Sequence, residues 1–322
     1  MLRLLGEIGV PLLIGVAYAW QVRRLERKGR APSLARQICF AAGLLVIALA
    51  IAGPLGNLSE DLVSAHMVQH LLLMDLAGFL LVMGVTGPVM APLMALPGLG
   101  WMRSLFHPAI ALAVFIGAFA IWHIPALYEG AAQNPALHAI EHGVFLFSGF
   151  IKWMALVGPF PAPLWFATGI QVVYVATEHL FVAAVGNVFM WAGTPIYAVY
   201  AERTAARGID PVTDQSIGGG IMAVEGMLLT LILLGWVLLR WSRHDTERQE
   251  IIELAEQHGL ALDESRVSRA VLAGHGENLR RRVLEQAEAR TTPAGEKRDT
   301  PAGNVASDPN LTPTATPPAQ AG

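Results

Sequence analysis

The sequence predicts an all-α membrane protein, a polytopic bundle of about seven transmembrane helices. The chain of 322 residues is 54% hydrophobic and only 15% charged, and its mean hydropathy is +0.48. These values are too apolar for a soluble domain of this length. Apolar runs long enough to cross a bilayer recur along the chain, and short segments rich in Gly, Pro and charge separate them. Together these observations indicate a multi-pass protein.

Hydropathy places the seven predicted spans within residues 1–243. They are residues 4–21, 37–55, 64–84, 106–124, 136–157, 164–184 and 218–241. The first span ends in Ala17-Tyr18-Ala19, which resembles a signal-peptidase site. Because the basic run that begins at Arg23 resists translocation, we expect the first segment to be retained. Residues 86–108 are too rich in Pro and Gly to span, and the sequence leaves the membrane depth of 186–200 open.

The distribution of cations orients the predicted bundle. Lys and Arg gather directly after the first and seventh spans, and Arg103 and Lys152 fall in two further loops on the same side. Cytoplasmic loops carry the excess of Lys and Arg in membrane proteins. The sequence therefore predicts an N-terminus outside and a C-terminus inside the cell membrane.

The chain changes character after the seventh span. Residues 244–290 are charged with helical periodicity, so we expect two cytoplasmic helices. Residues 291–322 are rich in Pro, Ala and Thr with few large apolar groups, which predicts disorder. We find no catalytic motif in either segment, and the net charge of −3 gives no electrostatic case for a nucleic-acid partner.

Two helices of the predicted bundle carry histidine pairs spaced by one helical turn. His66 and His70 open the third span, and His138 and His142 lie at the start of the fifth. Met74 continues the first stripe, because residues at i, i+4 and i+8 share one helix face at steps of about 6 Å. Both spans enter from the outer side in the predicted orientation, so the pairs are expected at matched depth. Imidazole groups inside a membrane are costly unless something is bound there.

Further polar residues are expected near the same outer level. The histidines expected to converge there are six of the ten, namely His66, His70, His123, His138, His142 and His179. Glu141 either orients a neighbouring imidazole or faces the outer water, and Asp214 with Gln215 closes the loop before the seventh span. Taken singly, each of these residues is usually a structural contact. Two His-x-x-x-His pairs at matched depth are harder to attribute to independent packing.

The donor types favour copper among the metals. The one cysteine, Cys39, lies in an apolar run, so neither an internal disulfide nor a thiolate site is available. Imidazole and thioether ligands suit copper better than structural zinc, whereas histidines on facing helices also suit haem. The sequence contains no His-Glu-x-x-His motif and no Ser or Cys nucleophile beside a base, so hydrolytic chemistry is not expected.

Five motifs follow one another through the membrane region. They are His66-Met67-x-x-His70-Leu71-Leu72, Trp122-His123-x-Pro125-x-x-Tyr128, Leu137-His138-x-x-Glu141-His142, Pro195-x-Tyr197-x-x-Tyr200 and Asp214-Gln215-x-x-Gly218-Gly219-x-x-Met222. In this order they resemble the CtaG-type cytochrome c oxidase assembly factors, a membrane family linked to caa-type oxidases, over roughly residues 40–240. The family usually reads Trp-x-Pro-Gly after the position of Met222, whereas this chain has Ala223-Val224-Glu225-Gly226.

The resemblance implies a seven-span protein of the cytoplasmic membrane that helps haem–copper oxidase to mature at a copper-insertion step. It implies oxidase subunits and other copper chaperones as partners and no turnover of a substrate. We therefore hypothesise transient copper binding at the outer leaflet, followed by transfer to an oxidase subunit. The core ligands are His66, His70, His138 and His142, with His123 and Met74 as further candidates. The groups that orient these ligands or gate the site are Glu141, Asp214, Gln215 and Glu225.

Three alternatives stay open at this point. A haem-binding membrane electron carrier predicts a Soret band in the purified protein. A metal or proton transporter needs a polar path through the inner leaflet, for which the sequence offers Asp75, Glu178 and Glu225. A metal-free scaffold that stabilises an oxidase subunit predicts that loss of the histidines leaves oxidase activity intact.

Overall fold

The computed structural model describes residues 2–98, 101–163, 165–166, 168–272, 274–291 and 311–313. It is almost entirely helical and divides into two compact units, Met1–Leu234 and Gly235–Gly322. The elements of the first unit are α1 (Leu2–Glu26), α2 (Leu34–Ala52), α3 (Pro54–Leu58), α4 (Val63–Leu71), the π-helix η1 (Leu72–Ala77), α5 (Gly78–Gly84), α6 (Gly87–Met94), α7 (Met102–Leu105), α8 (Pro108–Trp122), α9 (Pro125–Gln133), α10 (Pro135–Val157), α11 (Thr168–Trp191), α12 (Ala198–Ala206) and the first part of α13 (Pro211–Gln257).

The described residues contain five helical segments long and apolar enough to cross a membrane. They are Leu34–Leu58, Val63–Gly84, Pro135–Val157, Gly169–Trp191 and Pro211–Gln257. A sixth is present if α8 and α9, which meet at a bend of 73°, form one broken span. The chain is therefore a multi-pass membrane protein, while the count of seven and the orientation stay predictions.

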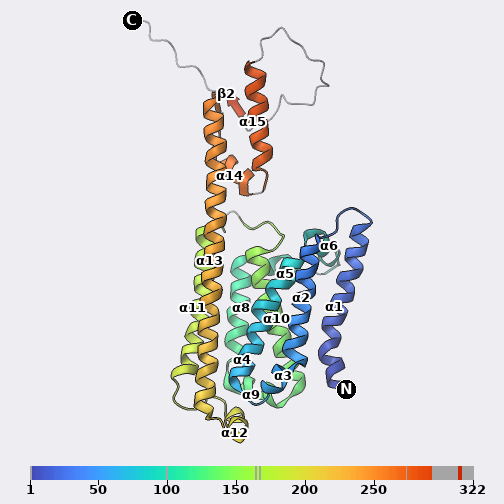
Figure 1. The fold of residues 1–322 in the computed structure, drawn as a ribbon, viewed down its shortest axis with the longest axis vertical. Coiled ribbons are helices and arrows are strands. Elements are labelled where there is room, and N and C mark those ends of the chain that lie inside the picture. The colour runs from blue at the N-terminus through green and yellow to red at the C-terminus, as the bar shows by residue number, and fades with distance from the viewer. Residues whose placement is uncertain are drawn as a thin grey trace. The chain divides into compact units, whose positions relative to one another are not determined.

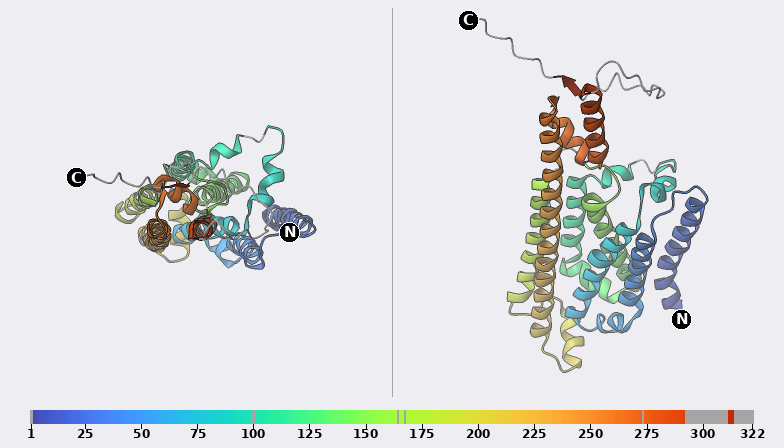
Figure 2. Two further views of the ribbon diagram at one scale, coloured as in Figure 1. Left: turned by 90° about the horizontal axis from the view of Figure 1, so that it is seen from above. Right: turned by 45° about the horizontal axis from the view of Figure 1, so that its top comes forward.

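The two segments that carry the histidine pairs are the most buried of the five. The most apolar stretch of Val63–Gly84 is 67% buried and that of Pro135–Val157 is 61% buried, against 22% for Leu34–Leu58. The corresponding figures for the α11 and α13 segments are 28% and 20%. Helices with exposed apolar faces suit lipid contact. Val63–Gly84 and α10 therefore form the centre of the unit, beside α2 and α8 (Figures 1 and 2).

The central segment is not a uniform α-helix. Its middle turns, Leu72–Ala77, form a π-helix between α4 and α5. At this level α10 approaches so closely that a Cβ on Gly149 would collide with the backbone of Met74, and one on Gly78 would press on Gly149 in return. Glycine permits this approach because it has no side chain. The π-helical turns also change the rotation per residue, so side chains beyond Leu71 leave the stripe that α-helical spacing predicts.

Several segment boundaries differ from the expected ones. α11 runs on to Trp191, and the polar stretch before the last span folds into α12. α13 begins already at Pro211. Figure 1 shows α3, α9 and α12 together at one end of the bundle, which is the end where α4 and α10 begin.

The expectation that Lys152 is a loop cation is wrong. α10 continues past it to Val157, and the Lys152 side chain is 2% exposed. Its ammonium pairs with Asp75 at 2.5 Å and with Glu178 at 3.0 Å inside the bundle. Lys152 therefore does not count among the cations that orient the chain.

The second unit is small and mixed. Its elements are the last part of α13, β1 (Leu260–Leu262), α14 (Glu264–Leu272), α15 (Gly276–Thr291) and β2 (Leu311–Pro313). β1 and β2 pair antiparallel, with Leu260 opposite Pro313. Ile251, Val267 and Val271 belong to its apolar core. The disorder expected for 291–322 falls outside the described residues apart from Thr291 and Leu311–Pro313.

Candidate metal centre

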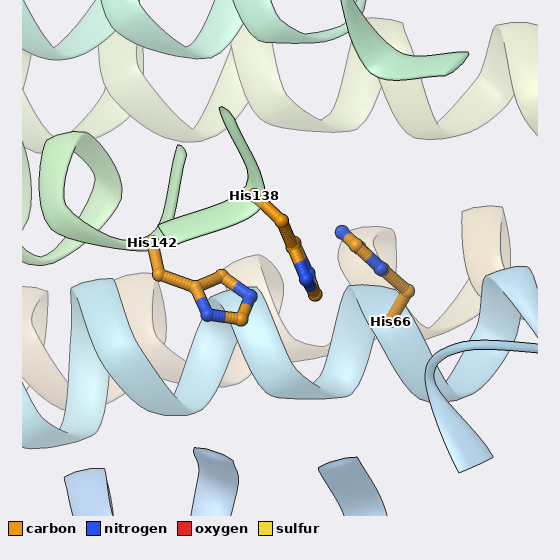
Figure 3. A group of neighbouring side chains, drawn as sticks. All are labelled: His66, His138 and His142. Atoms are coloured by element: carbon orange, nitrogen blue, oxygen red, sulfur yellow. The ribbon is translucent and has the colours of Figure 1, made fainter. Parts of the chain in front are cut away.

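Four imidazole rings from α4 and α10 meet between these two helices. The centroids of His66 and His70 on α4 are 4.2 Å apart, and so are those of His138 and His142 on α10. Across the helices, the ring of His66 lies 5.3 Å from His138 and 6.1 Å from His142, and that of His70 lies 5.6 Å from His142. Figure 3 shows the side chains of His66, His138 and His142 projecting into the same space.

Glu141 enters the same space from α10. Its Oε1 lies 3.6 Å from Nε2 of His70 and 3.8 Å from Nε2 of His66, and the residue is fully buried. Glu141 therefore does not face the outer water, and its expected role of orienting a neighbouring imidazole stays a prediction. We call these five residues, His66, His70, His138, Glu141 and His142, the histidine cluster.

Two overlapping groups within the histidine cluster have the spacing of metal ligands. One is His66 with His138 and His142, and the other is His66 with His70 and Glu141. Within each group the candidate donor atoms all lie within 4.8 Å of one another. An ion at bonds of about 2 Å holds ligand atoms at separations of this order, so either group has room for one ion after small side-chain adjustments.

Six donor atoms of His66, His70, Glu141 and His142 have no hydrogen-bond partner among the described residues. These atoms are Nε2 of His66, both ring nitrogens of His70, Nε2 of His142 and both carboxylate oxygens of Glu141, none of which has a hydrogen bond within the described part of the chain. His66 is 1% exposed, His70 2% and His142 7%. Buried polar atoms are normally hydrogen-bonded, and leaving them unpaired costs free energy. A bound cation satisfies them together, so the donor set fits a metal ion.

Tyr200 fixes the ring of His66. The Tyr200 hydroxyl donates to the carbonyl of Ser59 at 2.9 Å and lies 2.9 Å from Nδ1 of His66. Burial raises the pKa of the Tyr200 phenol, so the hydroxyl keeps its proton and remains a donor. With that proton committed to Ser59, the hydroxyl oxygen accepts from Nδ1–H of His66. This tautomer leaves a lone pair on Nε2, which is the arrangement that a metal-ligating histidine needs.

Helix starts hold both pairs in register. Asn134 caps α10, its Oδ1 accepting from the backbone N–H groups of Ala136 at 2.9 Å and Leu137 at 3.3 Å. α4 has no cap from its own N-cap residue, Leu62. Asp214 of α13 takes that place from a distant part of the sequence.

Asp214 accepts from the backbone N–H groups of Val63 at 2.7 Å and Ser64 at 3.4 Å, and from the Ser64 hydroxyl. Free N–H groups and the helix dipole at a helix start favour such a carboxylate. Asp214 thus anchors the turn that carries His66. Gln215 beside it binds Ile196 N, Phe189 O and Thr194 O, which holds the segment leading into α12.

His123, Met74 and Glu225 make contacts outside the two donor groups. His123 donates from Nδ1 to Phe119 O at 2.7 Å and stacks on the Phe119 ring at the end of α8. Met74 packs in an apolar cluster that includes Phe119 and Phe145. Glu225 lines a groove with Asp75, away from the histidine cluster.

His179, expected near the same level, packs instead against Gly226, where a Cβ would meet its Nδ1. It belongs to neither donor group. The expected convergence therefore holds for His66, His70, His138 and His142.

A polar opening leads to the histidine cluster. A cavity of about 300 Å³ is lined by His138, Tyr200, Arg203, Glu60 and Asp61, among others. A second, mostly apolar cavity of about 490 Å³ touches His138 and His142 from the side of α1 and α2. His138 thus lies between a charged entrance and the buried ligands.

Comparison with known proteins assigns the chain to a family. Residues 16–244 match the family model described as cytochrome c oxidase caa3 assembly factor (Caa3_CtaG). The chain belongs to this family. The match includes α4 and α10, which carry the histidine cluster, and α12, which carries Tyr200. The predicted family resemblance is therefore confirmed.

The curated relatives are distant in sequence and are longer proteins than this chain. Uncharacterized proteins of Mycobacterium bovis and Mycobacterium tuberculosis are each 24% identical over 261 residues, covering 75% of this chain and 39% of each relative. One of Mycobacterium leprae is 23% identical over 253 residues, covering 73% of this chain and 38% of the relative. The chain therefore spans less than half the length of these relatives. No solved structure matches it.

Sequence reasoning gave no role to the tyrosines at this end of the bundle. Tyr128 stacks on Tyr197 with ring centroids 3.8 Å apart, and its ring lies 5.0 Å from that of His66. Tyr200 closes the opposite edge of the His66 ring. All three stand in the motifs that carry the family resemblance. Their place in these motifs was the signal that could have identified them. Their contacts with His66 and with one another could not be predicted, because they depend on where α12 folds back.

Proposed function

We propose that this chain binds one copper ion transiently in the histidine cluster and passes it to a cytochrome c oxidase subunit during assembly. The observation that carries the proposal is the set of buried donor atoms without hydrogen bonds on His66, His70, Glu141 and His142. Membership of the caa3 oxidase assembly family supplies the context. The proposal includes residence in the cytoplasmic membrane and no catalytic turnover.

The donors support a small cation. Neutral imidazole suits copper, and copper exceeds the other divalent first-row metals in affinity for nitrogen sites. A haem needs its macrocycle between facing imidazoles, whereas these rings contact one another with centroids 4.2 to 6.1 Å apart. His123 and Met74 stay predicted further ligands of the same ion.

The approach to the cluster supports exchange rather than permanent storage. Glu60, Asp61 and Arg203 line the cavity that reaches His138, and Asp61 pairs with Arg207 at 2.7 Å, so the opening is polar and carries charges of both signs. His138 is half-buried, whereas His66 and His70 are buried. We expect His138 to meet the ion first and to release it last, at the outer membrane face.

The test is metal content of detergent-purified protein after Cu(I) or Cu(II) loading. We expect about one copper per chain in the wild type, because each donor group surrounds a single point. His66→Ala/His70→Ala is expected to lose this copper. His107→Ala is the matched control, since His107 lies at the opposite end of α8 from His123 and contacts Trp165 instead.

Other outcomes point to other functions. A Soret band that His66→Ala/His70→Ala removes contradicts the proposal in favour of a haem carrier. Oxidase activity that survives in cells carrying an abundant but copper-free double variant contradicts it in favour of a scaffold. Equal copper in the double variant and the wild type places the metal elsewhere.

A further inference from the structure

A second polar cluster lies deeper in the same bundle. The Lys152 ammonium on α10 binds Asp75 Oδ1 of η1 at 2.5 Å and Glu178 Oε1 of α11 at 3.0 Å. Lys152 is 2% exposed and Asp75 3%. The ammonium also faces the rings of Phe115 at 4.4 Å and Trp153 at 5.0 Å. None of these residues belongs to the histidine cluster.

Glu225 of α13 adds a third carboxyl group. Glu225 interacts electrostatically with Asp75, Lys152 and Glu178. It lines, together with Asp75 and Trp153, a mostly apolar groove of about 750 Å³ between the Val63–Gly84 segment and α13. We call Asp75, Lys152, Glu178 and Glu225 the lysine–carboxylate cluster.

The charges of this cluster do not balance if every group is ionised. Three carboxylates against one ammonium leave a net charge of −2 in a membrane-spanning bundle. Charges at such depth are costly unless they are paired. Asp75 and Glu178 both bind Lys152 directly, whereas the described residues provide Glu225 with no ion pair of its own. Glu225 is therefore the carboxyl group that gains most from holding a proton.

Two buried hydrogen-bond donors beside the cluster lack partners. The indole Nε1 of Trp153, a residue that is 2% exposed, and the hydroxyl of Tyr174, 5% exposed, make no hydrogen bond to described residues. Trp153 lines the groove with Glu225, and Tyr174 interacts with Lys152 and Glu178. Unpaired buried donors call for an acceptor such as a water molecule or a turned carboxyl group. Either gives a proton a route to Glu225.

We propose that the lysine–carboxylate cluster is a proton-binding site and that Glu225 holds its exchangeable proton. The titratable groups that interact with Glu225 are Asp75 of η1, Lys152 of α10 and Glu178 of α11. Of the other titratable groups on α11, Tyr174 interacts with Lys152 and Glu178, and His179 lies against Gly226. Lys152 holds two carboxylates by ion pairing, and the proton neutralises the third. The lysine–carboxylate cluster shares no residue with the histidine cluster, and this proposal stands without copper binding.

The test uses dicyclohexylcarbodiimide on the full chain in detergent. A protonated carboxyl group adds its O–H across one C=N bond of the carbodiimide, and acyl transfer to nitrogen then leaves a stable N-acylurea with no leaving group. Because Glu225 lines an apolar groove, we expect mass spectrometry to map the adduct to Glu225 at neutral pH. Labelling should fall several-fold as rising pH removes the proton.

Two variants and one internal control make the result decisive. Glu225→Gln is expected to lose the adduct and Glu225→Asp to keep it. Exposed Glu202 of α12 is the internal control, since it should react only with a water-soluble carbodiimide. An unlabelled Glu225 in folded wild type at every pH tested overturns the proposal. Labelling that persists unchanged at alkaline pH also overturns it, because the proton is then not exchangeable.

Discussion

The histidine cluster and the lysine–carboxylate cluster are built on the same two segments, Val63–Gly84 and α10, yet they solve burial in opposite ways. Lys152 and its carboxylates satisfy one another at 2.5 and 3.0 Å. His66, His70, His142 and Glu141 are also buried, but they carry donor atoms that have no hydrogen bond among the described residues. The comparison teaches that burial of polar groups does not by itself mark a binding site. Unpaired donor atoms that converge on one point do.

The largest effect is expected from breaking the ion pairs. Lys152→Met leaves Asp75 and Glu178 buried without a counter-charge, and removal of one partner from a buried pair costs about 3–5 kcal/mol. We expect a loss of that size in the free energy of unfolding, measured by denaturant titration in detergent micelles. Copper bound per folded chain should stay unchanged, because the histidine cluster has no contact with Lys152.

The control for this variant is Lys152→Met/Asp75→Asn/Glu178→Gln. It removes the stranded charges, so most of the lost stability is expected to return. If Lys152→Met alone is as stable as the wild type, the ion pairs do not stabilise the bundle. The contrast between the paired and the unpaired cluster is then contradicted.

The next effect concerns the close contact between α10 and the Val63–Gly84 segment, which carry residues of both clusters. Gly149→Ala places a methyl group against the backbone of Met74 in η1, and overpacking of this kind costs about 1–3 kcal/mol. We expect lower thermal stability together with weaker copper binding, because α10 must move away from the central segment. Gly143→Ala is the matched control, since no atom lies within 4 Å of its added Cβ. Equal stability of the two variants contradicts the close packing.

A third change separates metal affinity from stability. Tyr200→Phe removes the hydroxyl that holds Nδ1 of His66. Loss of such an orienting partner weakens metal binding about 10–100-fold. We expect that rise in the copper dissociation constant, measured by competition with a chelator, with little change in melting temperature. Tyr197→Phe is the control, because its hydroxyl donates to His123 O at 3.1 Å. Equal effects of both variants contradict the assignment of Tyr200.

The two clusters also differ in how far the sequence predicts them. Hydropathy and four-residue spacing suffice to pair His66 with His70 and His138 with His142, because one helical turn relates each pair. The family motifs place Glu141 between them. Met74 stays a predicted ligand, but it lies in the π-helix Leu72–Ala77, which interrupts the α-helical rotation on which that prediction rests. A change of helix type inside an apolar run leaves no mark in residue composition.

The lysine–carboxylate cluster escapes sequence reasoning for a different reason. Lys152 stands near the end of an apolar run, where a lysine usually marks the exit from the membrane. Only the packing of α10 against η1 and α11 turns it inward to Asp75 and Glu178. Tyr200 is similar, because the sequence leaves the membrane depth of its segment, 186–200, open. In the structure Arg203 and Thr204 bind the carbonyls of Glu60 and Asp61 and fix α12 there.

The smallest effect is expected at the start of α4. Asp214→Asn keeps an acceptor for Val63 N–H but removes the negative charge at the helix start, which is worth about 0.3–1 kcal/mol. We expect a slight loss of stability and a small rise in the copper dissociation constant, because the first turn of α4 carries His66. Asp214→Ala removes the cap altogether and should cost about 0.5–2 kcal/mol.

Asp210→Asn serves as the control for Asp214, since the Asp210 carboxylate is exposed and binds the backbone N–H and the hydroxyl of Thr213 within its own helix start. It should leave copper binding unchanged. A graded series, with Asp214→Ala weaker in copper affinity than Asp214→Asn, indicates that the histidine pair depends on helix order as well as on its own donors. An Asp214→Ala variant that binds copper as tightly as the wild type contradicts this, because the first turn of α4 then keeps His66 in place without its cap.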